Sequence, residues 1–173
     1  MAALSIIIAP DSRLKGHCEP VERVDKEVRK LMDGMLDAMH KHQGIGLAAP
    51  QVGVLKRVIV IDMAREGEEP APMRIANPEI VWTSEEEVLG EEGCLSLPQQ
   101  FGDVVRPKKA RVRYLDQDNQ EREIEAEDML ARCILHEMDH LEGILFVDHI
   151  SALKRNIILR KLTKMKKLME AAE

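Results

Sequence analysis

One helix constrains this chain more than any other segment, because it is apolar on much of its circumference and still carries two histidines and a glutamate. We expect it at residues 128–141, with Asp128 at the N-cap and Gly143 where the helix stops. Apolar side chains recur along it at helical spacing, namely Met129, Leu130, Ile134, Leu135, Met138 and Leu141. A polar group buried on such a helix is costly unless it is paired or bound. The rest of the chain must therefore wrap this helix and supply partners for its polar groups.

The polar residues of this helix form the pattern HExxH. His136 and His140 are four residues apart on one helical face, so both can bind the same cation. Glu137 follows the first histidine, where a carboxylate can take a proton from a water activated by the cation. The same pattern also arises by chance in core helices. Its context on a buried helix favours a metal centre with hydrolytic chemistry.

A catalytic centre of this type usually takes three protein ligands and leaves one position for water. Cys133 is seven residues from His140, roughly 10 Å along the helix, so we expect it in a pocket wall or in the core. We expect Cys18 to be an incidental loop thiol. Cys94 lies in the motif EGCLSLP, whose glycine permits close backbone approach. From the residues alone, Cys94 is either the third ligand or a small buried hydrophobe.

The segment GIGLAAPQVG at residues 44–53 has the glycine spacing of a dinucleotide-binding loop. Its context contradicts that function, because it follows an expected helix and not a strand, and Pro50 obstructs the helix that should begin there. Two interpretations remain. The segment is either a tight turn that presents backbone amides and the Gln51 carboxamide to a substrate, or a packed connection between a helix and a strand.

The remaining patterns predict an α+β fold. A helix is expected from Val24 to Met39, with Gly44 as its end, and residues 151–173 predict an amphipathic tail helix. Strands are expected at residues 57–62, 74–82, 110–115 and 121–125, with turns at 77–78 and 116–119. Strands clustered between helices favour antiparallel β-sheets packed around the central metal-binding helix, with an N-terminal helix and a C-terminal amphipathic helix.

Composition limits the class of protein. The 173 residues, 45% of them hydrophobic, suit a single domain over residues 1–173. Three scattered cysteines form no disulfide framework, and we recognise neither a membrane span nor a signal peptide, so we expect a cytoplasmic protein. Residues 151–173 hold seven Lys or Arg against two Glu, although the whole chain has a net charge of -6. Such a segment is typical of a solvated helical face or of a contact with a polyanion.

The motifs GIGLAAPQVG, EGCLSLP and HEMDHLEG, in this order and spacing, closely resemble the three signature motifs of peptide deformylases. The resemblance extends through nearly the whole chain. It implies removal of the formyl group from the N-terminal formylmethionine of newly made proteins. It also implies that Cys94 joins His136 and His140 as third ligand, and that the physiological ion is Fe2+, with Zn2+ or Ni2+ as alternatives in purified protein.

The resemblance further implies roles for individual residues. Glu137 acts as general base and then as general acid, while the Gln51 side chain and the Leu95 backbone N–H stabilise the oxyanion. The expected substrate site includes Ile45 and Gly46, whose motif positions would align an extended peptide, with Ile45 and Cys133 as walls of the pocket for the methionine side chain. We expect the charge of Arg132 to reach water, and Glu92 and Arg106 to form an ion pair. Leu135 departs from the family pattern, which usually has Gln at this position.

The expected partners are N-formylmethionyl nascent peptides, and the basic tail helix suggests contact with the ribosome. No membrane contact and no sequence-specific nucleic-acid binding are expected. Two other classes stay open, a zinc peptidase and a non-enzymatic ribosome-associated module with a structural metal. The Cys94 loop disfavours the peptidase, because such enzymes usually take His or Glu as third ligand.

Overall fold

The structure, a computed structural model, describes residues 3–173 and has an α+β architecture. A five-stranded antiparallel sheet has the order β1-β2-β3-β6-β7, and β4 pairs with β5 in a separate two-stranded sheet. The strands are β1 (Gly46–Ala48), β2 (Val58–Asp62), β3 (Pro72–Thr83), β4 (Glu87–Cys94), β5 (Leu97–Pro107), β6 (Lys109–Leu115) and β7 (Glu121–Glu127). The helices are α1 (Lys26–Lys41), α2 (Met129–Leu141) and α3 (Ala152–Ala171), with short 3-10 turns η1 (Ser12–Lys15), η2 (Ala49–Val52) and η3 (Phe146–His149).

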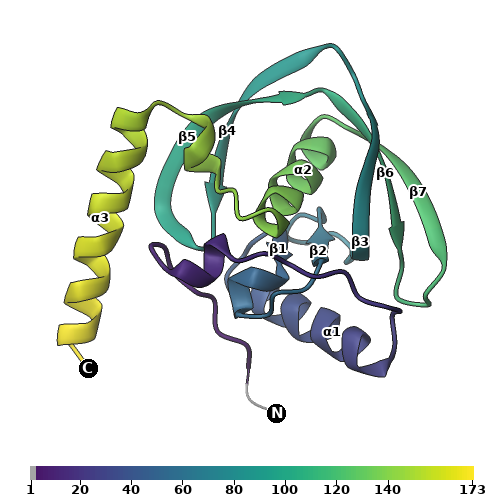
Figure 1. Cartoon of the computed structure of the whole chain (residues 1–173), viewed down its shortest axis with the longest axis horizontal. Coiled ribbons are helices and arrows are strands. Elements are labelled where there is room, and N and C mark those ends of the chain that lie inside the picture. Colours follow the sequence, from purple (N-terminus) through teal and green to yellow (C-terminus); the bar gives the residue numbers. More distant parts are fainter. Residues whose placement is uncertain (1–2) are drawn as a thin grey trace.

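Helix α2 lies in the middle of the molecule and is framed by the strands (Figure 1). Strand β2 explains how the layers form, because all five of its residues are buried. Ile59 and Ile61 belong to the core cluster that includes α2, whereas Val58 and Val60 belong to the cluster that includes α1. The alternation of side chains along a strand thus fills the space on both faces of the sheet. The five-stranded sheet is sandwiched between α1 and α2.

The predicted helices are present, with small differences at their ends. Asp25 caps α1 by accepting a hydrogen bond from the Val28 N–H, and α1 ends at Lys41, three residues before Gly44. Asp128 occupies the N-cap of α2, but its side chain makes no capping hydrogen bond. Gly143, with φ of +72°, follows the end of α2 in the left-handed region that glycine adopts without strain.

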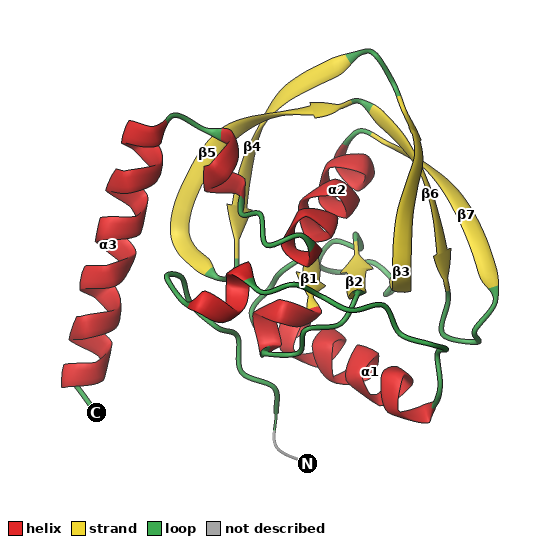
Figure 2. Ribbon diagram, viewed as in Figure 1, coloured by secondary structure: helices red, strands yellow, loops and turns green. Residues whose placement is uncertain are grey.

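The strand predictions were incomplete. The expected turn at Asn77-Pro78 is wrong, since β3 runs through this position and Asn77, at φ +49°, only shifts its register against β6. Strands β4 and β5 were not predicted at all. Their long hairpin curves around one side of α2 (Figure 2).

Helix α3 stands at the periphery, beside β5 and η3 (Figure 1). The expected apolar side docks only in part. Ile158 and Leu162 are buried, while Leu153 and Leu168 are more than 60% exposed. No helix within residues 3–173 combines the length and the apolar character needed to cross a membrane.

Candidate metal centre

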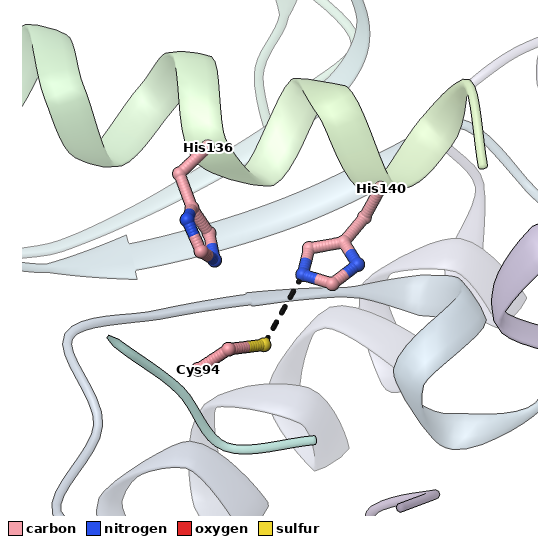
Figure 3. Close-up of side chains that lie close together, drawn as sticks. All are labelled: Cys94, His136 and His140. Atoms are coloured by element: carbon pink, nitrogen blue, oxygen red, sulfur yellow. Dashed lines mark hydrogen bonds between the residues drawn. The ribbon is translucent and has the colours of Figure 1, made fainter. Parts of the chain in front are cut away.

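The site forms where α2 meets the end of the β4–β5 hairpin. His136 and His140 project from α2 toward the hairpin, and Cys94 is the last residue of β4 (Figure 3). The register shifts between Gly93 and Cys94, so that Cys94 pairs with Leu97 and its side chain turns toward the helix. The structure therefore brings together the two helical histidines and the cysteine of a distant motif.

The three potential ligand atoms are close enough to share one ion. The sulfur of Cys94 and one nitrogen of each histidine all lie within 4.8 Å of one another. Cys94 Sγ lies 3.4 Å from His140 Nε2 (Figure 3). A thiolate and two imidazoles are a donor set that fits Fe2+ or Zn2+. Cys133 is not part of this group, because its Sγ points to the Ile45 carbonyl oxygen at 3.8 Å.

Burial keeps His140 in the neutral form that can bind a cation. Desolvation of His140 holds its pKa well below the usual value, so its ring is neutral at pH 7 and can offer a lone pair. Burial would also lower the pKa of His136, but the charge of Glu137 and hydrogen bonds to Cys94 and Glu92 raise it well above the usual value. In the metal-free protein, the groups that favour the protonated ring of His136 would also favour a cation bound to that ring.

Glu92 orients the ring of His136. Its Oε1 lies 2.8 Å from His136 Nδ1, while Arg106 donates two hydrogen bonds of 2.9 Å to the same carboxylate. Burial tends to raise the pKa of Glu92, but the hydrogen bonds from Arg106 and His136 hold it well below its usual value. The carboxylate is therefore ionised and accepts from Nδ1, which leaves Nε2 of His136 free for a cation. The expected Glu92–Arg106 ion pair is confirmed, and it is buried.

Glu137 is buried next to the ligand group. Desolvation raises the pKa of its carboxyl group to about 7, although the charge of His136 opposes the shift. Its Oε1 lies 4.0 Å from His140 Nε2 and is buried without any hydrogen-bond partner among the described residues. A Cβ at Gly46 would come within 2.5 Å of its Oε2, so only glycine leaves room for the carboxylate. A carboxylate oxygen that has no hydrogen-bond partner within residues 3–173 and lies beside the thiol and the two imidazoles is the arrangement expected of a base that acts on a water at a cation.

Gln51 approaches the site from the other side. It is buried on η2, and its Oε1 accepts a hydrogen bond from the Ala48 N–H at 2.9 Å. Its Nε2 donates to Ser96 Oγ at 3.0 Å and to Cys94 Sγ at 3.4 Å. The carboxamide is thus held through both its oxygen and its nitrogen, and Nε2 lies next to the proposed ligand Cys94. The segment GIGLAAPQVG forms β1 and η2, which fits a turn that presents Gln51.

A cavity of about 930 Å3 opens onto these residues. Ile45, Gly46, Leu95 and Cys133 line it, together with Gln51, Cys94, His136 and Glu137. The sequence did not indicate its other walls, which include residues 3–6 and the exposed side chains of Phe101 and Met129. Phe101 lies in the unpredicted strand β5, and no periodicity in the N-terminal segment connects it with a site.

One expectation about a side chain near the site was wrong. The charge of Arg132 does not reach water, because the guanidinium is buried and hydrogen-bonded to Glu92 and to backbone carbonyls of β4 and β5. The expectation that Cys18 is a loop thiol without a role in the ligand group is confirmed, and its buried side chain is part of the core cluster around α2.

Comparisons with known proteins agree with this site. A family model described as "Polypeptide deformylase" matches residues 3–156. A peptide deformylase of Methylocella silvestris is 54% identical over 166 residues, which cover 94% of this chain and 85% of that protein. A peptide deformylase of Phenylobacterium zucineum is 51% identical over 164 residues, 95% of this chain and 97% of that protein. The crystal structure of peptide deformylase from Ehrlichia chaffeensis in complex with actinonin has a TM-score of 0.90 at 46% identity, and the match covers 95% of this chain and 98% of that chain.

Proposed function

This chain belongs to the peptide deformylase family, and we propose that its Cys94, His136 and His140 hold the divalent cation with which it works. The protein is a hydrolase that removes the formyl group from N-terminal formylmethionine, which releases formate and leaves a free amino terminus. The observation that carries the ligand assignment is the convergence of three donor atoms within 4.8 Å, beside the unpartnered Oε1 of Glu137.

We propose Fe2+ as the physiological ion. The thiolate and imidazole donors also suit Zn2+, and Ni2+ is an alternative in purified protein. A bound cation would supply Lewis acidity, which makes water nucleophilic at neutral pH and polarises the formyl oxygen. Metal analysis of anaerobically purified protein, coupled to a formate assay, tests this assignment. Full activity in preparations that contain Zn2+ and no iron would contradict it.

Glu137 is proposed as the group that moves the proton. Its raised pKa suits a base near neutral pH, and its Oε1 faces the ligand group. It would take a proton from the attacking water and pass it to the nitrogen of the leaving amine. Gln51 Nε2 and the backbone N–H of Leu95 would donate hydrogen bonds to the oxygen of the formyl group as negative charge develops there.

The large cavity is the proposed site for the formylmethionyl end of the substrate. Its walls at Ile45 and Cys133 would contact the methionine side chain. Strand β1 begins at Gly46, and an extended peptide would lie next to it as an added strand. Residues 1–173 would act together as one catalytic domain, because α2 contacts both β1 and β5.

We propose contact with the ribosome through α3, in a cytoplasmic protein. The helix combines basic side chains with exposed Leu153 and Leu168, and it lies at the periphery of the molecule (Figure 1). Binding to a polyanion through Lys and Arg weakens as salt increases. Co-sedimentation with ribosomes at two salt concentrations tests the proposal, and salt-insensitive or absent binding would contradict it.

The activity itself is tested with formyl-Met-Ala-Ser as substrate. Formate release from this peptide, without cleavage of unformylated Met-Ala-Ser, is the expected result. Cleavage of the unformylated peptide would instead indicate a zinc peptidase. A protein that binds metal but changes neither peptide would indicate the non-enzymatic module.

A further inference from the structure

Arg132 is a buried arginine whose side-chain hydrogen bonds, among the described residues, all go to the β4–β5 hairpin. Its Nη1 donates to Glu92 Oε2 at 2.7 Å and to the Val104 carbonyl at 2.8 Å, with a longer bond of 3.4 Å to the Gly90 carbonyl. Its Nη2 donates to the Val88 carbonyl at 2.7 Å. The guanidinium therefore joins one carboxylate and three carbonyls of β4 and β5. A planar fork of fixed donors can hold several acceptors in a defined geometry, which a flexible ammonium cannot do.

This contact joins the two elements that carry the ligand group. Arg132 lies on α2 one turn before His136, whereas its partners lie on β4 and β5, and β4 ends at Cys94. Arg106 makes a second link between the hairpin and the helix, through its 2.7 Å bond to Asp139. Within residues 3–173, β4 and β5 pair with each other and with no strand of the five-stranded sheet, so that sheet does not hold the hairpin in place. Its position relative to α2 therefore depends on such bridges.

Gly90 shows how closely the hairpin fits around this side chain. A Cβ at Gly90 would lie 2.8 Å from the Cζ atom and 2.9 Å from Nη2 of Arg132. Such a contact is too short for both groups to keep their places. A glycine at position 90 is thus required for the guanidinium to reach the hairpin carbonyls.

We propose that Arg132 is a positioning residue that sets the distance between Cys94 and the two histidines of α2, and that through Glu92 it also fixes the ring of His136. The inference rests on the proposed ligand set. Metal affinity depends on ligand distances within a few tenths of an ångström, so a hairpin that shifts against α2 weakens binding even when every ligand is present. Groups that orient ligands typically change metal affinity by about 10- to 100-fold when they are removed.

The test is the affinity of the folded protein for Co2+, measured by competition with a chelator and by the absorption band of a thiolate–Co2+ bond. Arg132→Met is expected to bind Co2+ about 10- to 100-fold more weakly and to show an altered thiolate band. Arg132→Lys is expected to lose most of this affinity as well, because an ammonium cannot bridge the same carbonyls. Arg74→Met is the control, since Arg74 pairs with Asp33 on α1, away from the ligand group, and should leave both readouts unchanged.

Three outcomes would overturn the proposal. Wild-type affinity and spectrum in folded Arg132→Met would show that Arg132 has no positioning role, and full rescue by Arg132→Lys would show that only its charge matters. If Arg132→Met does not fold, Gly90→Ala takes its place, because the added methyl group displaces the guanidinium without removing it. Unchanged Co2+ binding in Gly90→Ala would then contradict the proposal. Cys94→Ser separates this result from the ligand set itself, because wild-type binding in that variant would mean that Cys94 is not a ligand.

Discussion

Glu92 Oε1 lies 2.8 Å from His136 Nδ1, and this contact connects a network of charged side chains to one of the proposed ligands. Arg106 and Arg132 both donate to Glu92, and Arg106 continues to Asp139, which His149 also contacts at 2.8 Å. The ligand group is therefore not held by α2 alone. Its geometry also depends on Arg106 of the hairpin and Arg132 of α2, which both donate to the carboxylate of Glu92.

Glu92→Gln should weaken both the fold and the metal centre. The substitution removes the negative charge that compensates two buried guanidinium groups, and breaking such a buried pair typically costs about 3–5 kcal/mol. It also leaves His136 Nδ1 with a weaker acceptor, so metal affinity should fall by about 10- to 100-fold. Urea unfolding of the metal-free protein and chelator competition measure the two effects. Asp33→Asn, which weakens the Arg74 pair, is the control for loss of a partly exposed ion pair, worth about 1 kcal/mol or less.

Glu137→Gln should abolish formate release while the metal stays bound, because the amide has nearly the same shape but cannot take a proton. The variant should also stabilise the metal-free protein. Burial raises the pKa of Glu137 in the folded protein to about 7, above its ordinary value of 4.5. The folded protein therefore loses stability as the pH rises from 4.5 to 7, and this loss remains at higher pH. The stability gained by the variant should accordingly be larger at pH 8 than at pH 5. Urea unfolding at both pH values checks this, and an equal gain at both would contradict the assigned shift.

The acid limb of the wild-type activity provides a second measure of the same group. A carboxyl group that must be ionised to act as a base loses activity as pH falls through its pKa. A cation nearby favours the carboxylate, so the limb in the loaded enzyme should lie below pH 7. A pH profile of kcat for formyl-Met-Ala-Ser gives its position. A limb above pH 7 would exclude Glu137 as the base.

Gln51→Ala should lower kcat by about 10²- to 10³-fold, the typical cost of removing one donor to an oxyanion. The truncation also deprives the Ala48 N–H of its acceptor, so some loss of stability is expected, and folded protein must be compared. Ser96→Ala is the matched control. It removes one partner of Gln51 Nε2 but leaves the amide next to Cys94, so its loss of kcat should be much smaller. Equal losses in both variants would mean that Gln51 acts only by packing.

The sequence predicted the parts of this molecule that depend on local periodicity. Helix α2 was predicted because its apolar residues recur at helical spacing, and the α+β class followed from the order of helices and strands. Strands β4 and β5 were missed because 10 of their 19 residues are polar or glycine and their apolar residues do not alternate regularly with polar ones, which gives no strong strand pattern. The pairing of β4 with β5 also depends on contacts with distant residues, because Arg132 of α2 hydrogen-bonds to carbonyls of both strands.

Arg132 shows the same limit at the level of one side chain. An arginine on an apolar helix was expected to extend to water, since its ordinary partners are solvent and surface acids. Its actual partners lie 28 to 44 residues away in sequence, on a hairpin that was not predicted. From the residues alone, Cys94 was either a third ligand or a small buried hydrophobe, and the resemblance of its motif to a known family favoured the first alternative. No spacing rule joins residue 94 to residue 136.

Leu135→Gln should leave metal affinity and kcat unchanged and should lower stability modestly. Leu135 is buried next to His136 in sequence, but it lines a second cavity of about 480 Å3, with Met138, and it does not line the large cavity of the metal centre. Burying an amide without a partner costs about 1–3 kcal/mol in proteins, and contact with this cavity keeps the cost at the low end because water can hydrate the new group. Leu135→Ala is the control, since it adds no polar group and its cost reflects lost packing alone, about 2–5 kcal/mol. Urea unfolding, chelator competition and formate release measure the three quantities. A large change in kcat with Leu135→Gln would mean that the geometry of the metal centre depends on the side of α2 that faces the second cavity.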